Sequence, residues 1–111
     1  DLVAKIGNDE VVIPAAKAKV LKDKGYVGKT VVMGIRPEDV ADRADGSMSS
    51  TVKVYELLGA EVFLYLTVDG FDVTCREHPS TKAKPGDIMN ISFDVNKIHV
   101  FDKETQMTIT N

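Results

Sequence analysis

The sequence contains one cysteine, no tryptophan, three tyrosines and four phenylalanines. A single cysteine excludes an internal disulfide. No apolar run approaches the roughly 18 residues that a membrane-spanning helix needs. Acidic residues outnumber basic ones, 17 to 14, so the net charge is -3 and the isoelectric point is about 5.3. An acidic domain attracts a phosphate backbone poorly, so we expect no nucleic-acid partner.

The composition is that of a globular domain. Of 111 residues, 43% are hydrophobic and 28% are charged, which is typical of one folded domain with a modest core rather than of a disordered chain. The sequence begins at Asp1, and the strand-like run 2–6 follows at once. We therefore expect a piece of a longer protein.

The first fifty residues predict strands at 2–6, 11–13 and 30–35, since apolar residues run between polar turns there. Pro37 has no N–H to donate to a ladder and is expected to end the third strand. The stretch 41–50 is small, polar and glycine-containing, and it predicts a loop or linker.

One short helix is predicted at 14–24. It opens with a proline, which suits the first turn, and continues with good helix formers. Ala16 and Val20 are expected to share its apolar face. Gly25 is expected to cap its C-terminus.

The second half is denser in strand signals, and turns are expected at Asp69-Gly70 and Pro85-Gly86, with Gly59 at a bulge or sharp bend. In the first strand, Val52 and Val54 are expected on one face. The predicted strands are 51–57, 62–68, 71–75, 87–93, 98–101 and 107–109. The expected core-facing residues are Val62, Leu64, Leu66 and Val68, then Phe71, Val73 and Cys75, and finally Met89, Ile91 and Phe93.

Short strands separated by turns every 8 to 12 residues predict an all-β fold with one short helix, arranged as a small OB-like barrel. We expect two OB-like parts, at 1–40 and 51–111.

Gly28-Lys29-Thr30 resembles the end of a phosphate-binding P-loop. That motif needs a glycine five positions before its second glycine, where this chain has Asp23. A P-loop also follows a strand and opens a helix, whereas here a predicted helix comes first. The stretch therefore predicts a helix-to-strand connection and no ATP site.

Metal and nucleophile chemistry have weak signals. Cys75 and His78 have ligand spacing, with His99 as a third partner, but structural zinc usually has four ligands. A buried thiol beside a surface histidine is the simpler reading of Cys75 and His78, although contact between them would allow nucleophilic catalysis. The acidic residues Glu38, Asp39, Asp42 and Asp45 lack a calcium-loop pattern. We expect no catalytic, cofactor-binding or metal residue.

Four motifs in order resemble sugar-importer ATPases of the MalK/MsmK type. Residues 34–40 (GIRPEDV) resemble their GIRPE signature, and 55–61, 84–87 and 98–102 resemble their E-x-L-G-x-E, turn and H-x-F-D segments. The helix end at 23–26 is most similar to the multiple-sugar branch. The resemblance implies the C-terminal regulatory TOBE domain of that family, with its first strand lacking.

In that family the whole protein couples ATP hydrolysis to carbohydrate uptake. The resemblance implies that ATP and Mg²⁺ bind in a nucleotide-binding domain preceding Asp1, and that this piece has no chemistry of its own. The implied partners are a second copy, membrane permease subunits through the preceding domain, and a regulator of sugar uptake. The implied location is the cytoplasmic face of the cell membrane.

Family positions also mark candidate residues. The candidates for regulatory or dimer contact are Gly59, Glu61, Gly86 and Phe101, and those of the structural junction are Gly34, Arg36, Pro37 and Glu38. The simpler readings are a bend at Gly59, a turn at Gly86 and a core position for Phe101. Arg36 and Glu38 are expected to pair with charges across the junction.

Two other functions remain open. An oxyanion-binding TOBE module would need convergent hydroxyl and lysine groups, for which 80–82 and 29–30 are the only hints. A nucleic-acid-binding OB domain would use exposed aromatics, and Phe63 and Tyr65 are the one pair on the outer face of a strand.

Overall fold

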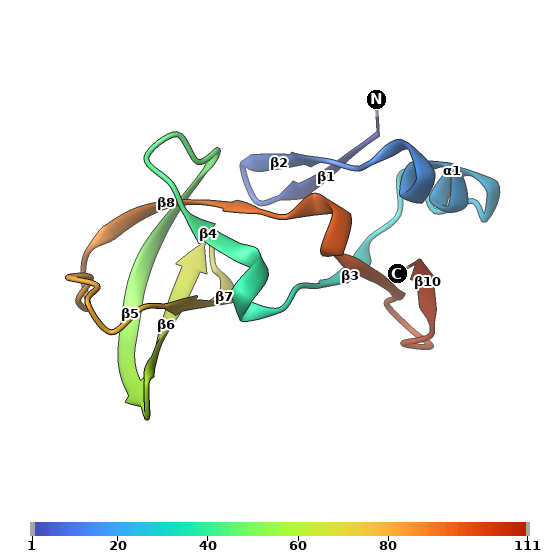
Figure 1. Cartoon of the computed structure of the whole chain (residues 1–111). Coiled ribbons are helices and arrows are strands. Elements are labelled where there is room, and N and C mark those ends of the chain that lie inside the picture. The colour runs from blue at the N-terminus through green and yellow to red at the C-terminus, as the bar shows by residue number, and fades with distance from the viewer. Residues whose placement is uncertain (1, 111) are drawn as a thin grey trace.

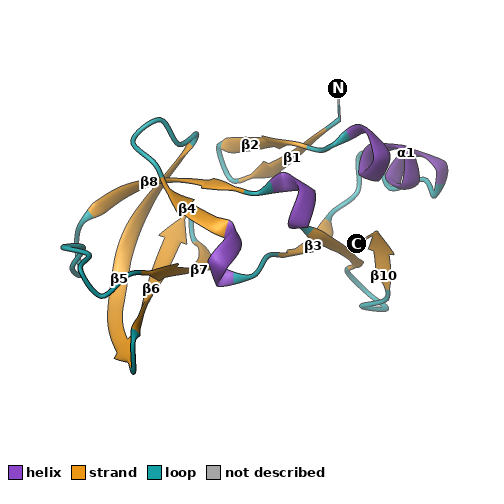
Figure 2. Cartoon of the chain, in the orientation of Figure 1, coloured by secondary structure: helices purple, strands orange, loops and turns teal. Residues whose placement is uncertain are grey.

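A computed structural model describes residues 2–110 as ten strands, one α-helix and two 3₁₀ helices (Figure 1, Figure 2). In chain order the elements are β1 (Val3–Ile6), β2 (Asp9–Val12), α1 (Ala15–Asp23), β3 (Val31–Gly34), η1 (Pro37–Asp39), β4 (Val40–Asp42), β5 (Met48–Leu58), β6 (Glu61–Val68), β7 (Phe71–Glu77), β8 (Ile88–Phe93), η2 (Val95–Lys97), β9 (His99–Asp102) and β10 (Thr108–Thr110).

The strands form three antiparallel sheets. The largest has the order β4-β8-β5-β6-β7, the second β10-β9-β3, and the third is the hairpin β1-β2. The molecule is elongated, with extents of 44 × 26 × 22 Å, and the β5–β6 hairpin projects at one end while α1 lies at the other (Figure 1). The predicted class, all-β with one short helix and OB-like, is confirmed.

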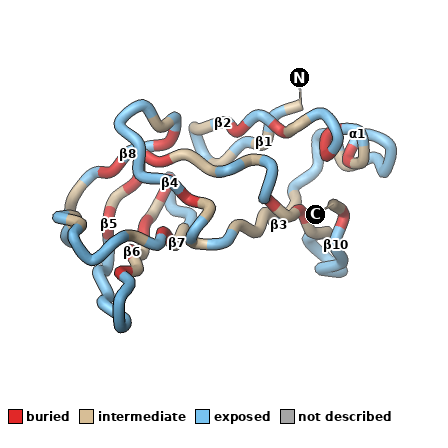
Figure 3. The backbone as a smooth tube through the Cα atoms, in the orientation of Figure 1, coloured by how far each residue is buried: buried red, intermediate tan, exposed pale blue. Residues whose placement is uncertain are grey.

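Two apolar clusters hold the sheets together, and they appear as separate buried stretches in Figure 3. The larger lies inside the five-stranded sheet and includes Leu64, Leu66 and Ile91, none of which is exposed to solvent. The smaller joins α1 to the three-stranded sheet through Leu21, Ile98 and other residues. Within residues 2–110, no helix is long and apolar enough to cross a membrane.

The strand β3 pairs with β9 near the end of the chain, and β10 extends the same sheet. This sheet therefore draws strands from both parts predicted by the sequence. The division at 1–40 and 51–111 stays a prediction, as does the lack of a first strand.

Helix α1 confirms the predicted element, and its end is capped as expected. The Tyr26 amide donates to the Leu21 carbonyl at 2.9 Å and the Gly25 amide to the Lys22 carbonyl at 3.1 Å, which is the Schellman pattern. The predicted face is wrong in part. Ala16 is exposed, and the buried positions are Lys17, Ala18 and Leu21. A lysine buries its stem easily, so the face that packs on the sheet is rotated.

The predicted loop at 41–50 is shorter than expected, because β4 ends at Asp42 and β5 begins at Met48. Both strands pair with opposite edges of β8, for example Asp42 with Ile91 and Met48 with Ile91. Ladder hydrogen bonds to a central strand thus override the polar composition of this stretch.

Two predictions of side-chain direction are wrong. A register shift between Val52 and Val54 inserts Lys53 as a β-bulge, so Val52 is buried and Val54 is 48% exposed. Phe71 is 56% exposed although Cys75, on the same face, is buried. It begins an edge strand, where no further strand in the sheet covers it. The remaining predicted core residues are buried or half-buried.

Candidate interaction surfaces

The projecting β5–β6 hairpin carries an apolar outer face. Its register pairs Val54 with Tyr65, Glu56 with Phe63 and Leu58 with Glu61, so four apolar or aromatic residues share this face with two glutamates. Leu58 is 52% exposed, and Phe63 and Tyr65 are half-exposed. We call these four residues, Val54, Leu58, Phe63 and Tyr65, the hairpin surface. The opposite face of β6 is fully buried at Val62 and Leu64, so the strand's alternation separates core from surface.

Charged pairs border the hairpin surface. Arg76 lies 3.4 Å from Glu61, and Lys53 lies 2.9 Å from Asp72. The Tyr65 hydroxyl donates to Glu56 at 3.1 Å, and this bond raises the pKa of Tyr65. An exposed apolar face with a polar border is the usual composition of a protein interaction site.

Gly59 and Glu61 lie at the tip of this hairpin. Gly59 has φ 62° and is the first of the two residues that connect β5 to β6, a position where a II′ turn needs a glycine. A side chain there would meet no atom within 4 Å. The glycine is therefore explained by backbone geometry, while Glu61 is held by Arg76 beside the hairpin surface.

Gly86 is the third residue of a type II turn. Pro85 precedes it, its φ is 95°, and the Asp87 amide donates to the Lys84 carbonyl at 3.1 Å. Its own amide donates to the Val52 carbonyl at 2.8 Å. This accounts for the glycine structurally and fixes the turn against β5.

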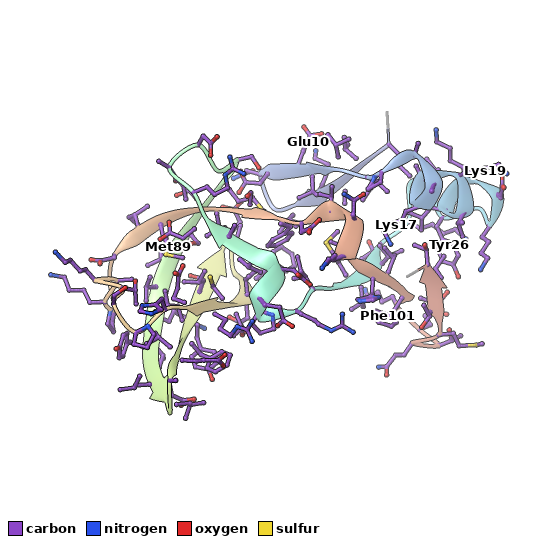
Figure 4. The ribbon with its side chains drawn as sticks, viewed as in Figure 1. Glu10, Lys17, Lys19, Tyr26, Met89 and Phe101 are labelled. Atoms are coloured by element: carbon purple, nitrogen blue, oxygen red, sulfur yellow. The ribbon has the colours of Figure 1, made fainter. Side chains whose placement is uncertain are left out.

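Phe101 lies on the outer face of the three-stranded sheet rather than in a core cluster (Figure 4). A β-carbon on Gly34 would come within 3.0 Å of the Phe101 ring, so the ring covers that glycine. The His99 ring centre is 6.5 Å away, and neighbouring Val32 is 46% exposed. Gly34 of the predicted junction therefore leaves the space that the Phe101 ring occupies.

The rest of the junction turns the chain from β3 into η1. Pro37 is the first residue of η1, and the Asp39 amide donates to the Arg36 carbonyl at 2.9 Å. Within residues 2–110 no ion pair includes Arg36 or Glu38. The junction thus orients the backbone by proline geometry, and the expected charge pairing is not among its contacts.

The candidate residues do not converge on one site. Gly59 and Glu61 lie at the hairpin tip, Gly86 lies in the turn before β8, and Phe101 lies on a different sheet. Sequence reasoning missed the hairpin surface as a unit, because only Phe63 and Tyr65 were recognised as outward. The bulge at Lys53, which turns Val54 outward, has no clear sequence signal.

The residues considered for other chemistry are separated as well. Gly28-Lys29-Thr30 follows α1 and precedes β3, which is the reverse of a P-loop. Burial, with Glu77 nearby, raises the pKa of the Cys75 thiol to about 12, so it carries little thiolate at neutral pH. His78 is exposed and bonds Ser80 at 2.8 Å, while His99 lies on the other sheet.

Thr81 and Lys82 line a shallow cleft of about 380 Å³ together with Arg43. Asp42 and Asp87 line it too. Those negative charges disfavour an oxyanion ligand. A second cleft, of about 440 Å³, lies between β2 and α1, where Val12, Ile13 and Ala18 provide apolar walls.

A hydrogen-bonded clasp joins the segment after α1 to the end of β9. The Tyr26 hydroxyl donates to Asp102 at 2.6 Å, and the amides of Glu104 and Thr105 donate to the same carboxylate at 2.9 Å. These bonds favour the charged carboxylate and hold the pKa of Asp102 at about 2, chiefly through the Thr105 amide. The Tyr26 pKa is raised, first by its bond to Asp102.

We expect Asp102→Asn to lower the Tm at pH 7, because the amide cannot replace the charged acceptor. Because the Asp102 pKa is lowered in the fold, its charged carboxylate stabilises the fold at pH values above the ordinary pKa of 3.8. That contribution disappears as the pH falls towards about 2. The Tm difference from wild type should therefore shrink between pH 4 and pH 2 in melts followed by circular dichroism. Glu104→Gln is the control, and a difference independent of pH would contradict the clasp.

Comparison with known proteins places the chain in a family. The model of the TOBE domain matches residues 33–101, which is more than half of the chain, and the model of the MalK OB fold domain matches residues 2–40. The chain therefore belongs to the TOBE domain family.

Individual relatives agree over most of the chain. Over 98% of it, the sequence is 39% identical to the Oligosaccharides import ATP-binding protein MsmX of Bacillus subtilis. It is 33% identical over 97% to the Multiple sugar-binding transport ATP-binding protein MsmK of Streptococcus mutans, and 35% identical over 82% to the Trehalose/maltose import ATP-binding protein MalK of Thermococcus litoralis. The chain spans 32%, 30% and 27% of the lengths of those three relatives, respectively.

Proposed function

We propose that the chain is the C-terminal regulatory and dimerisation module of the ATP-binding subunit of a sugar-importing ABC transporter. The supporting observation is that relatives named as sugar-import ATP-binding proteins match 82–98% of this chain, while the chain spans about a third of their length. The rest of such a protein would bind ATP and Mg²⁺. This module would carry no chemistry of its own.

The proposed partners follow from the same role. A second copy of the chain would meet the hairpin surface, permease subunits would bind through the ATP-binding domain, and a regulator of sugar uptake would dock on the exposed faces. The location would be the inner side of the cell membrane, within the transporter complex. An exposed apolar face on a rigid hairpin, with a polar border, suits contacts of this kind.

We expect the chain to self-associate weakly in sedimentation velocity experiments over a range of concentrations. Leu58→Asp should raise the dissociation constant about tenfold or more, since a charge would be buried at an apolar contact. The matched control is Val27→Asp, because Val27 is 56% exposed but lies in the connection after α1. A chain that stays monomeric, or equal effects of both variants, would contradict dimerisation through the hairpin surface.

The absence of chemistry is tested separately by isothermal titration with Mg²⁺ and ATP. No saturable heat is expected, because Asp23 stands where a P-loop has glycine. Stoichiometric ATP binding would overturn the assignment of nucleotide binding to another domain.

A further inference from the structure

The β1–β2 hairpin is a small sheet of its own that lies between the two apolar clusters. Among the strands that the structure describes, β1 and β2 pair only with each other. Near the turn of this hairpin, Ile6 and Val11 pack into the larger cluster. At its open end, Leu2 and Ile13 pack into the smaller cluster. In Figure 1 the hairpin accordingly runs from the five-stranded sheet towards α1, so it spans both clusters like a strap.

The turn of this hairpin touches a second turn from a distant part of the chain. Gly7 and Asn8 connect β1 to β2, and Asp69 and Gly70 connect β6 to β7. The Asn8 amide donates to the Asp69 carboxylate at 2.9 Å. A hydrogen bond to a charged acceptor is stronger than one between neutral groups. The Asp69 side chain therefore joins the turn of the hairpin to the end of strand β6.

Gly7 allows the two turns to come into direct contact. Its φ is 60° at the first position of a two-residue turn, where a II′ turn needs glycine. A β-carbon there would meet the Asp69 β-carbon and would stand 2.7 Å from an Asp69 carboxylate oxygen. Gly59 has nearly the same φ, 62°, at the corresponding place of the β5–β6 turn, yet a β-carbon there would meet no atom within 4 Å. Turn geometry accounts for both glycines, but of the two only Gly7 also leaves room for a neighbouring turn.

We propose that the β1–β2 hairpin is a strap that fastens the two apolar clusters together, and that the Asp69 carboxylate is the fastener of its turn. Because no ladder to another described strand holds the hairpin, release of this contact lets it open as a unit, from the turn to Ile13. Strand β6 leads from Asp69 back to Phe63 and Tyr65 of the hairpin surface. Under the proposed function, the strap and β6 would carry a displacement of the preceding ATP-binding domain to that surface.

Hydrogen exchange of the 111-residue chain, followed amide by amide by NMR, measures how often the strap opens. Asp69→Gly removes the carboxylate and keeps a residue suited to the positive φ of this position, 49°. We expect the hairpin amides to exchange about three- to tenfold faster, out to the Ile13 amide, which donates to the Leu2 carbonyl at 2.9 Å. The amides of β6 should change by less than about twofold, although Asp69 follows that strand directly.

Two further variants separate the fastener from the geometry of the turns. Asp69→Asn keeps an acceptor oxygen without its charge and suits the same turn, so its hairpin exchange should lie between wild type and Asp69→Gly. Gly7→Ala should accelerate hairpin exchange about tenfold or more, because backbone strain and the clash with Asp69 both count. Gly59→Ala is the matched control, since it introduces similar strain without a clash, and residues 3–13 should exchange as in wild type. In the Asp69→Gly background, Gly7→Ala should have a smaller effect than in wild type.

The strap is overturned if Asp69→Gly leaves the hairpin amides unchanged, or if it accelerates the β6 amides by the same factor, since Asp69 would then serve only its own turn. Faster exchange confined to the amides beside Gly7 and Asn8 would overturn it too, because the contact would then hold the turn alone. Equal effects of Gly7→Ala and Gly59→Ala on the hairpin would exclude Asp69 as the fastener. Each outcome is read on a dilute, monomeric chain, so it is distinct from the tests of self-association and nucleotide binding.

Discussion

Gly46→Ala is expected to destabilise the chain by about 3 kcal/mol or more, the upper range for overpacking a filled site. Gly46 lies in the connection between β4 and β5, where its backbone crosses directly over β8. A β-carbon there would stand 2.6 Å from the Ile91 carbonyl oxygen and 2.8 Å from its nitrogen. Real β-carbons essentially never approach so closely, and a backbone cannot swing aside as a flexible side chain does.

The cost is high because Ile91 is fixed from both sides. It pairs with Asp42 on β4 and with Met48 on β5, and it is not exposed to solvent. To relieve the clash, the connection must therefore move away from β8, although β4 and β5 hold β8 on both sides. Urea unfolding at pH 7 measures the loss. Ser47→Ala is the control, because Ser47 is exposed and next in sequence, and such changes usually stay within about 0.5 kcal/mol. Equal midpoints for the two variants would refute the crowding.

Local patterns predicted much of the fold. Asp69-Gly70 forms the expected hairpin turn, with positive φ at both residues, and Gly25 ends the helix as expected. Along β6 the alternation of buried and outward side chains is as predicted from Val62 to Val68. These features depend on a few neighbouring residues, which is why sequence reasoning reaches them.

Features set by distant parts of the chain were not predicted. The pairing of β3 with β9 joins segments whose strand signals are individually ordinary. The rotated face of α1 depends on the sheet beneath it, and the bulge at Lys53 depends on how β5 must bend between β6 and β8. The candidate surfaces share this property. Phe101 was read as a contact or core residue, and its ring lies over Gly34 of β3, a contact between distant parts of the chain.

Leu64→Ala is expected to be the other strongly destabilising change. Leu64 is not exposed at all, and it lies in the centre of the larger apolar cluster between Tyr55 on β5 and Cys75 on β7. Truncating a buried leucine costs about 2–5 kcal/mol, because the transfer energy of the lost methyl groups and the cavity both count. Against a total stability of about 5–15 kcal/mol, this loss leaves the folded state marginal.

Leu57→Ala is the matched control for this substitution. Leu57 is on the same hairpin and points to the same side, yet it is 55% exposed because it lies beyond the cluster, near the hairpin tip. Its truncation should cost less than about 1 kcal/mol, and Leu64→Met, which conserves volume, less than about 1.5 kcal/mol. Urea midpoints of the three variants give the comparison. If Leu57→Ala costs as much as Leu64→Ala, the Leu57 side of the hairpin tip is buried in solution, on the face opposite the hairpin surface.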